Sequence, residues 1–392
     1  MKKLGIFGLL LLFSVISANT SYGSGIDILT ETLMNKNIIQ PGEGQMIMTL
    51  SKEEQKKQEV KKKLGKLELG GDLRMRYQYQ DKEGSVPRAR QRIRFRLKGK
   101  AEMQKVEVGF RFATGGVDSR STNETLDGFF ATPDIRLDYA YAKYMPKKIG
   151  AIGGKFPGKK ILWTPSDLLW DGDINLDGAG IMYSKKPVFV NCGILALDEL
   201  KKNVKDPLMY TFQTGVMTKT GKAGIKVAAT IYGLEHPYNI DTSDFYYGEI
   251  SGGSNTRDAS GNLKYDYDSA AGGIEVKFKD IILSSLFGEV INNLDPEEYN
   301  LGYLGGIKLK KGKASLKYMY RKLEKDAWPD IFPDSDSYGG KTGVEGSEII
   351  LGCKLTNKIS AGIDYYMMNN IDENSDNVKT QHLVQADLKI KF

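Results

Sequence analysis

Two residue types that metal sites and exported disulfide scaffolds depend on are nearly absent. The 392-residue chain has only two cysteines and two histidines. Two cysteines cannot form a disulfide scaffold or a four-cysteine zinc site, and two histidines leave little room for histidine-based metal chemistry. Beyond the N-terminus there is no run of about 18 apolar residues, which excludes a bundle of membrane-spanning helices. The mean hydropathy of −0.38 still permits an outer-membrane β-barrel, because the strands of such barrels alternate apolar and polar residues.

The first residues have the pattern of a secretory signal peptide. Two lysines precede an almost unbroken apolar stretch over residues 4–16, which is too short to span a bilayer. Small residues predict cleavage after Gly23, with Ala18 as the other candidate. We therefore expect residues 1–23 to be a signal peptide and the protein to be exported; an uncleaved membrane anchor is the alternative.

Residues 24–65 have a helical pattern. Apolar residues from Ile26 to Leu33 fall at helical spacing, and Ser51 with Glu54 has the spacing of a capping box before a second helix. The second helix is charged and nearly free of apolar residues. We expect a periplasmic segment that acts as a plug, a tether or an oligomerisation element; a flexible linker is the alternative.

The remaining chain, residues 66–392, alternates apolar and polar residues with a period of two. In the last segment every second residue from Val384 to Phe392 is apolar, and the residues between them are polar. The same alternation places Ile135, Leu137, Tyr139 and Tyr141 on one face of another segment. Such alternation is typical of half-buried strands, and segments of about ten residues suit tilted membrane-spanning strands.

The lengths of the connections alternate as well. Seven short turns and eight longer loops separate the segments, which predicts sixteen strands. Bacterial outer-membrane barrels have an even strand number, short periplasmic turns and long outer loops, so both termini are expected on the periplasmic side. The predicted fold is therefore an all-β transmembrane antiparallel barrel of about 16 strands over residues 66–392. A secreted β-sandwich or β-solenoid is the alternative.

Several motifs resemble a known family. They comprise residues 71–77, 88–97, 109–115, 121–127, 135–141 and 167–171. On these motifs the chain resembles the "putative porin" family of diderm bacteria, most densely from about 66 to 184. The resemblance implies a sixteen-stranded outer-membrane channel with a short N-terminal helical segment. The terminal Phe392 resembles the signal that the barrel-assembly machinery reads.

Basic residues occupy every second position over residues 88–98. Each charge would cost about 2 to 4 kcal/mol near the middle of the bilayer if it faced lipid, so these side chains are expected to face the lumen. The predicted basic ladder comprises Arg74, Arg76, Arg90, Arg92, Arg94, Arg96, Arg111 and Arg136. Such a wall should attract anions. The alternative is that Asp72, Glu68, Glu107 and Asp138 pair with these arginines as structural ion pairs of the wall.

The loop over about 157–173 is too apolar for an external loop, which argues that it packs inside the barrel. The likeness to porins implies an inward third loop that narrows the channel and faces the arginine wall. The candidates for this constriction are Trp163, Asp167, Trp170, Asp171 and Asp173. An acidic loop opposite arginines would order water and favour small, polar, charged solutes. A surface loop that makes an aromatic protein contact is the alternative.

No metal or cofactor is expected. Asp171 begins a stretch that starts like an EF-hand loop, but Leu176 stands where glycine is needed and Met182 where the bidentate glutamate is needed. A looser calcium site on these carboxylates, or on Asp334 and Asp336, stays open.

Enzyme activity is not expected either. His382 could serve as a base, but no Ser or Asp lies at a diagnostic spacing from it. Cys192 and Cys353 fall on apolar strand faces, where they should face lipid far apart and remain unbonded.

These patterns predict a water-filled channel for passive diffusion of small hydrophilic, charged solutes or ions. The alternative is a structural outer-membrane anchor whose helical segment tethers the envelope, with peptidoglycan as the partner of residues 26–65. The other expected partners are outer-membrane lipid and the barrel-assembly machinery, and a homotrimer is expected by analogy with porins. Nucleic acid is not expected, because the basic residues lie in a strand ladder and not on an exposed face.

Overall fold

The computed structural model describes residues 25–64, 66–200, 204–239, 253–371 and 377–392. The predicted signal peptide lies outside the described residues. The chain divides into two compact units, Met1–Gly65 and Lys66–Phe392.

The first unit contains two helices, α1 (Gly25–Asn35) and α2 (Pro41–Leu64). The backbone N–H of Gln40 donates to the Glu43 carboxylate at 3.0 Å, which caps α2 at its start, and proline suits the first helical position. The predicted capping box at Ser51 is therefore wrong, because Ser51 lies inside α2. Among the described residues, no helix combines the length and the apolar character needed to cross a membrane.

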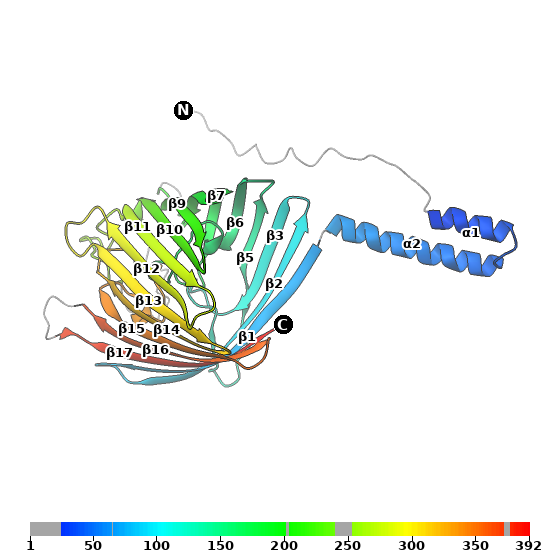
Figure 1. Cartoon of the computed structure of the whole chain (residues 1–392). Coiled ribbons are helices and arrows are strands. Elements are labelled where there is room, and N and C mark those ends of the chain that lie inside the picture. Colours follow the sequence, from blue (N-terminus) through cyan, green and yellow to red (C-terminus); the bar gives the residue numbers. More distant parts are fainter. Residues whose placement is uncertain (1–24, 65, 201–203, 240–252, 372–376) are drawn as a thin grey trace, which may run out of the picture. The chain divides into compact units, whose positions relative to one another are not determined.

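The second unit is a closed antiparallel β-barrel (Figure 1). Its long strands are β1 (Lys66–Lys82), β2 (Arg88–Met103), β3 (Val106–Thr114), β5 (Ile135–Tyr144), β6 (Ile149–Pro157), β7 (Asn175–Lys185), β8 (Val188–Ala196), β9 (Leu208–Thr220), β10 (Ala223–Glu235), β11 (Ser269–Phe278), β12 (Leu283–Asn293), β13 (Leu301–Lys311), β14 (Ala314–Leu323), β15 (Val344–Lys354), β16 (Ile359–Asn370) and β17 (Thr380–Lys391). The short β4 (Glu124–Thr125) pairs with β2. Three single-turn 3-10 helices lie in loops: η1 (Gly158–Lys160), η2 (Pro237–Asn239) and η3 (Tyr338–Gly340).

Each long strand pairs with the next, and β17 returns to pair with β1. Of the seventeen strands, all but the two-residue β4 take part in this ring, which confirms the predicted sixteen-stranded barrel. The short turns lie at one end of the barrel, the turn end, and the longer loops lie at the other, the loop end.

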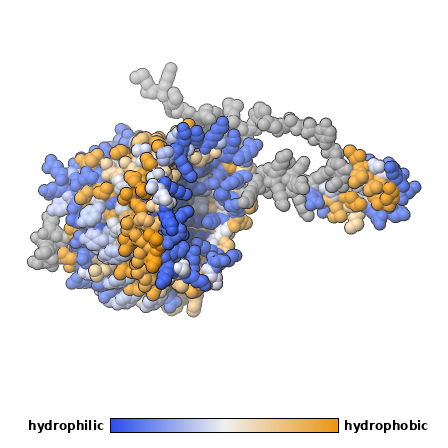
Figure 2. Space-filling model, viewed as in Figure 1, coloured by the Kyte–Doolittle hydropathy of each residue, from blue (hydrophilic) through white to orange (hydrophobic). Residues whose placement is uncertain are grey.

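Because apolar and polar residues alternate along the strands, apolar side chains cover the outer surface of the barrel. Ile181 and Ile231 are 60% and 53% exposed, whereas their chain neighbours Met182 and Tyr232 are 4% and 1% exposed. Hydrophobic side chains accordingly appear as orange patches on the barrel surface (Figure 2). Cys192 and Cys353 are both free and exposed, as expected.

The alternation is interrupted within β5. Arg111 and Phe112 of β3 pair with Tyr139 and Leu137, so Asp138 is an extra residue in β5. Such a bulge shifts the following side chains to the opposite face. Leu137 is 55% exposed, but Tyr139 is 8% exposed. The prediction that Tyr139 and Tyr141 share the outer face with Leu137 is therefore wrong: both rings lie inside the barrel.

The C-terminal residue contributes to the closure of the barrel. Phe392 and Gly71 of β1 exchange two backbone hydrogen bonds of 3.0 and 3.1 Å. The Phe392 ring stacks on Phe95 with centroids 5.9 Å apart. A Cβ atom at position 71 would lie 2.5 Å from this ring, so the close approach requires glycine. Whether Phe392 also acts as an assembly signal stays a prediction.

Candidate functional site

The interior of β1 and β2 presents arginines at directly opposite positions. Arg74 is paired in register with Arg94, and Arg76 with Arg92. Arg74, Arg76 and Arg94 are each less than 9% exposed. Like charges at opposite positions repel one another, so this wall needs carboxylates around it.

Two aspartates on neighbouring strands supply much of that compensation. Asp387 of β17 accepts two hydrogen bonds from Arg76, of 2.7 and 2.9 Å, in the bidentate geometry that arginine favours. Asp72 of β1 forms ion pairs of 2.9 Å with both Arg94 and Arg96. These members of the predicted ladder are therefore partly neutralised within the wall.

The other ladder members differ in their surroundings. Arg111 is paired with Asp138. Arg136 lies near the start of β5, where its side chain is 44% exposed and pairs with Asp134. Among the described residues, the hydrogen bonds that Arg92 donates all go to uncharged groups. The acceptors are the Gln78 side chain at 3.2 Å, and the Ser121 hydroxyl and the Asn123 carbonyl at 3.4 Å.

The structural ion pairs considered as an alternative form only in part. Asp72 and Asp138 hold arginines, as that alternative expects. Glu107, however, pairs with Lys160 at 2.6 Å, and Glu68 lies 3.7 Å from Lys100. Arg90 is not free of interactions, and it lines the cavity at the loop end of the barrel.

The loop between β6 and β7, residues 158–174, runs through the interior. The Trp163 backbone exchanges hydrogen bonds of 2.8 and 2.9 Å with the Gln213 side chain on β9. Farther along, Asp167 pairs with Arg321 of β14 at 2.7 Å, and Asp173 pairs with Arg96 of β2 at 3.2 Å. A loop with contacts on β2, β9 and β14 crosses the barrel.

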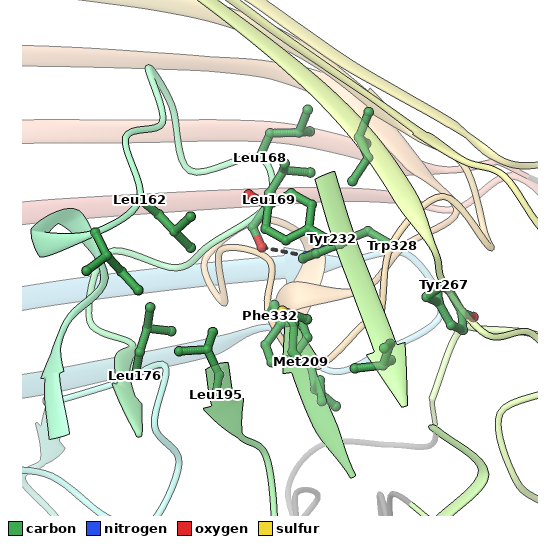
Figure 3. Close-up of a cluster of buried hydrophobic side chains, with 14 of the residues drawn as sticks. Leu162, Leu168, Leu169, Leu176, Leu195, Met209, Tyr232, Tyr267, Trp328 and Phe332 are labelled. Atoms are coloured by element: carbon green, nitrogen blue, oxygen red, sulfur yellow. Dashed lines mark hydrogen bonds between the residues drawn. The ribbon is translucent and has the colours of Figure 1, made fainter. Parts of the chain in front are cut away.

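An aromatic cluster holds this loop in place (Figure 3). Trp170 lies 4.7 Å from Phe332 and 5.7 Å from Trp328, measured between ring centroids. The indole N–H of Trp328 donates to the Leu169 carbonyl at 2.8 Å, the bond dashed in the figure. Trp328 and Leu169 are fully buried. Burial of these rings offsets the loss of chain entropy on fixing the loop.

The residues predicted to form the constriction therefore contact different strands and loops of the barrel. Asp173 faces the arginines, and it also accepts a hydrogen bond of 3.0 Å from the Thr122 hydroxyl. Asp171 accepts a 2.8 Å bond from the backbone of Ser335. Asp167 pairs with Arg321 of β14, while Trp163 and Trp170 pack between strands and loops. Their role in conduction stays a prediction.

A second inward loop covers residues 324–343 between β14 and β15, where the sequence suggested only a looser calcium site on Asp334 and Asp336. Its Asp336 lies 3.3 Å from Arg76, so it also meets the arginine wall. Ala327 and Trp328 are fully buried, and Ile331 is 2% exposed. The apolar content that predicted an inward course for residues 157–173 was also present here and could have predicted it.

Arg321 joins the two inward loops to the wall. Its side chain lies 2.7 Å from Asp167, 3.6 Å from Asp334 and 3.2 Å from Glu348 of β15. These three carboxylates lie close enough to hold a metal ion. Arg321 already supplies the positive charge that a metal ion would provide among them. We therefore interpret the cluster as a contact that fixes the two inward loops to the barrel wall.

Two cavities lie on either side of the arginine wall. The turn-end cavity has a volume of about 670 Å³, and the loop-end cavity about 360 Å³. The charged residues that line the turn-end cavity are Lys98, Lys100, Arg111, Lys159, Lys160, Lys317, Glu68, Asp167 and Asp171. Those of the loop-end cavity are Lys82, Arg88, Arg90, Arg92, Lys341, Asp118 and Asp336. Cations outnumber acids in both. Arg74, Arg76, Arg94 and Arg96 line neither cavity and lie between them on β1 and β2.

Two neighbouring acids of the loop over residues 158–174, Asp171 and Asp173, differ in charge. Burial, followed by the neighbouring Asp173, raises the pKa of Asp171 to about 8. Burial also acts to raise the pKa of Asp173, but Arg94, Arg96 and Arg74 together hold it below its ordinary value. At neutral pH Asp173 is therefore ionised, and Asp171 is mostly protonated.

This difference predicts a pH-dependent selectivity. Because the pKa of Asp171 lies near 8, its carboxyl ionises as the pH rises from 7 to 9 and adds a negative charge beside Asp173 and Asp336. We expect the anion-to-cation permeability ratio to fall over this range. The measurement is the reversal potential in a salt gradient at pH 7, 8 and 9.

The matched variant is Asp171→Asn, which cannot ionise. Burial also lowers the pKa of Lys159 in the wall of the turn-end cavity, so the relevant quantity is the difference between the two proteins. An identical pH profile for the two would rule out Asp171 as the titrating group, whereas a flatter profile in the variant is expected.

Comparison with known proteins finds one family model and several solved structures that are similar to this chain. Residues 75–244 match the family model described as "Putative porin", which confirms the resemblance drawn from the motifs. Similar solved structures include a mutant of the Rh. blastica porin, 11% identical over 83% of this chain and 100% of that chain, with a TM-score of 0.49. Another, titled "Asymmetric conductivity of engineered proteins", is 12% identical with the same coverage and TM-score. A triple mutant of the Rhodopseudomonas blastica porin gives 12% identity, the same coverage and a TM-score of 0.48. Among curated proteins no match was found.

Proposed function

With residues 75–244 matching the porin family model, we propose that the chain is a bacterial outer-membrane channel for passive diffusion of small hydrophilic, charged solutes. The observation that carries the proposal is the inside-out distribution of side chains. Apolar residues cover the outside of a closed barrel, while arginines, lysines and carboxylates surround its interior. In a bilayer the only arrangement that stabilises both surfaces is lipid outside and water inside.

The charges further support a preference for anions. Both cavities have more cations than acids in their walls, and Arg74, Arg76, Arg94 and Arg96 lie between them on β1 and β2. An anion would therefore meet basic side chains along its whole path. A small cation would instead have to pass Arg92, whose described contacts are with uncharged groups.

The test is conductance of the purified protein in a planar bilayer. We expect stepwise openings and a reversal potential that indicates more permeant anions than cations in a salt gradient. A correctly folded barrel that stays silent at every voltage would overturn the channel and favour the anchor.

Lipid exposure of the outer face can be tested separately. Ile274 lies in the middle of β11 and is 45% exposed. We expect Ile274→Arg to lower the free energy of unfolding in lipid by about 2 to 4 kcal/mol, because an arginine would meet the hydrocarbon near its midplane. The measurement is denaturant-induced unfolding in lipid vesicles.

The control for this substitution is Gln80→Arg, which places the same side chain on the inner face beside the loop-end cavity. We expect its effect to be smaller than that of Ile274→Arg, because water solvates the new charge and screens its repulsion from Arg88, the register partner of Gln80. Equal losses in the two variants would argue against a lipid-facing β11.

The structural anchor is the second candidate. In the first unit, Ile28 of α1, Met46 of α2 and Ile38 between the two helices are more than 60% exposed. Apolar side chains on so short a helical unit favour a contact with another molecule. Deleting residues 26–65 tests this: a tether predicts loss of envelope attachment with normal conductance, and unchanged attachment would exclude it.

Assembly follows by analogy with porins. We propose a homotrimer in the outer membrane, inserted by the barrel-assembly machinery through the C-terminal strand that ends at Phe392. Export through the N-terminal signal peptide belongs to the same proposal.

A further inference from the structure

The turn-end cavity combines cationic and apolar walls in a way that passive conduction does not require. Lys98 of β2 is directly opposite Arg111 of β3, and both point inward. Lys159 of η1 lies near them, close enough for Arg111 and Lys98 to act on its charge. Three basic side chains from two strands and the start of the inward loop thus converge on one side of the cavity.

Only some of the basic side chains in this part of the cavity are paired with a carboxylate. Arg111 is held by Asp138, and Lys160 by Glu107 at 2.6 Å. Within the described part of the barrel, neither Lys98 nor Lys159 has a carboxylate within ion-pair distance. Burial and then the neighbouring cations, Arg111 first, lower the pKa of Lys159. This corner of the cavity therefore has a surplus of positive charge that an anion would relieve.

Aromatic and apolar groups form other parts of the same cavity wall. Trp163 and Pro165 lie against β11, where a Cβ on Gly273 would come within 3.3 Å of both. Lys226 lies over the Trp163 ring, 4.6 Å from its centroid, and Trp163 also lines the cavity. Tyr139 and Tyr141 line it as well, with Arg111 4.9 Å from the centre of the Tyr139 ring.

We propose that the turn-end cavity is a binding site for an organic anion that carries a planar apolar ring, such as an aromatic carboxylate. The carboxylate meets Lys98 and Lys159, and the ring packs on Trp163. The cavity volume of about 670 Å³ lies within the range of small-molecule sites. The proposal rests on the proposed channel function and deepens it: the channel has a saturable site for one class of solute.

Calorimetry on the full-length protein in detergent tests the site without requiring conduction. Benzoate is the ring-bearing probe, and acetate carries the same charge without the ring. We expect benzoate to bind more tightly than acetate. We expect the double variant Lys98→Gln with Lys159→Gln to weaken benzoate binding at least about tenfold.

Two further variants separate the parts of the site. Trp163→Leu should lower the preference for benzoate over acetate by about threefold or more, because the stacking surface is lost. Lys82→Gln with Lys341→Gln removes two charges from the loop-end cavity and should leave benzoate binding unchanged. Equal weakening by both lysine pairs would mean a general charge effect and would overturn the site.

The same variants in bilayers distinguish the two proposals. Benzoate should reduce the current in a saturable manner, and the Lys98 and Lys159 double variant should lose this block while still conducting. Conductance without any benzoate binding or block would overturn the site and leave the channel standing. Binding by a protein that does not conduct would support the site and overturn the channel.

Discussion

Replacing Arg321 with methionine is expected to detach both inward loops and to lower the free energy of unfolding by about 3 to 5 kcal/mol. The Arg321 side chain is 2% exposed, and it lies within ion-pair distance of three carboxylates, on Asp167, Asp334 and Glu348. Methionine fills similar space but leaves those three carboxyl groups without the arginine that holds them. Denaturant-induced unfolding in detergent, followed by tryptophan fluorescence, measures the effect.

One control variant and one compensating substitution show whether the loss comes from this cluster. Arg136→Met removes an arginine whose side chain is 44% exposed, so we expect a loss below about 1 kcal/mol. Adding Glu348→Gln to the Arg321 variant removes one uncompensated carboxylate and should recover part of the stability. If the Arg321 variant were as stable as the Arg136 variant, the cluster would not anchor the loops.

Loop detachment has a second readout. Because the loops cross the interior, their release should widen the path and make the single-channel current larger and noisier. A destabilised barrel with unchanged current would mean that Arg321 stabilises the wall alone.

The barrel could be predicted because lipid and water act on every residue of a strand in turn. In β17, every second residue from Val384 to Ile390 is apolar, as expected for side chains that face lipid. The residues between them are polar, as expected for side chains that face water. The strand number followed from the alternation of short and long connections, which the hairpin topology imposes. Neither inference needed knowledge of which strands touch.

The errors arose where pairing between strands matters. The face of Tyr139 depends on one extra residue in β5, and that bulge exists only in relation to β3. Similarly, the bidentate partner of Arg76 is Asp387, brought beside it because β17 closes the barrel against β1. Local periodicity contains no information about either register.

The site itself was only partly predictable. The apolar content of residues 157–173 predicted an inward loop, and the structure places that loop inside. Residues 324–343 carry the same signal in Trp328, Ile331 and Phe332, yet the contacts that bring Asp336 to Arg76 come from tertiary packing. The net charge beside the arginine wall therefore depends on two loops, and the sequence predicted an inward course for one of them.

The second large effect is expected from Arg92. Most arginines of the wall lie close to a carboxylate, and removing one of them disturbs an ion pair as well as the field. Arg92 instead donates to Gln78, Ser121 and the Asn123 carbonyl, and it lines the loop-end cavity. Its substitution therefore changes the charge that a passing ion meets while leaving the described ion pairs in place.

We expect Arg92→Gln to shift the reversal potential toward cations. A unit charge about 6 Å from a passing ion contributes roughly 0.7 kcal/mol in water, which corresponds to about a threefold change in the population of that ion. Arg92→Lys retains the charge and should keep the anion preference, whereas Arg136→Gln removes a charge at the exposed start of β5 and should change it less. If all three variants gave the reversal potential of the unmodified protein, the arginine wall would be a structural feature, and selectivity would have to come from the cavities on either side of it.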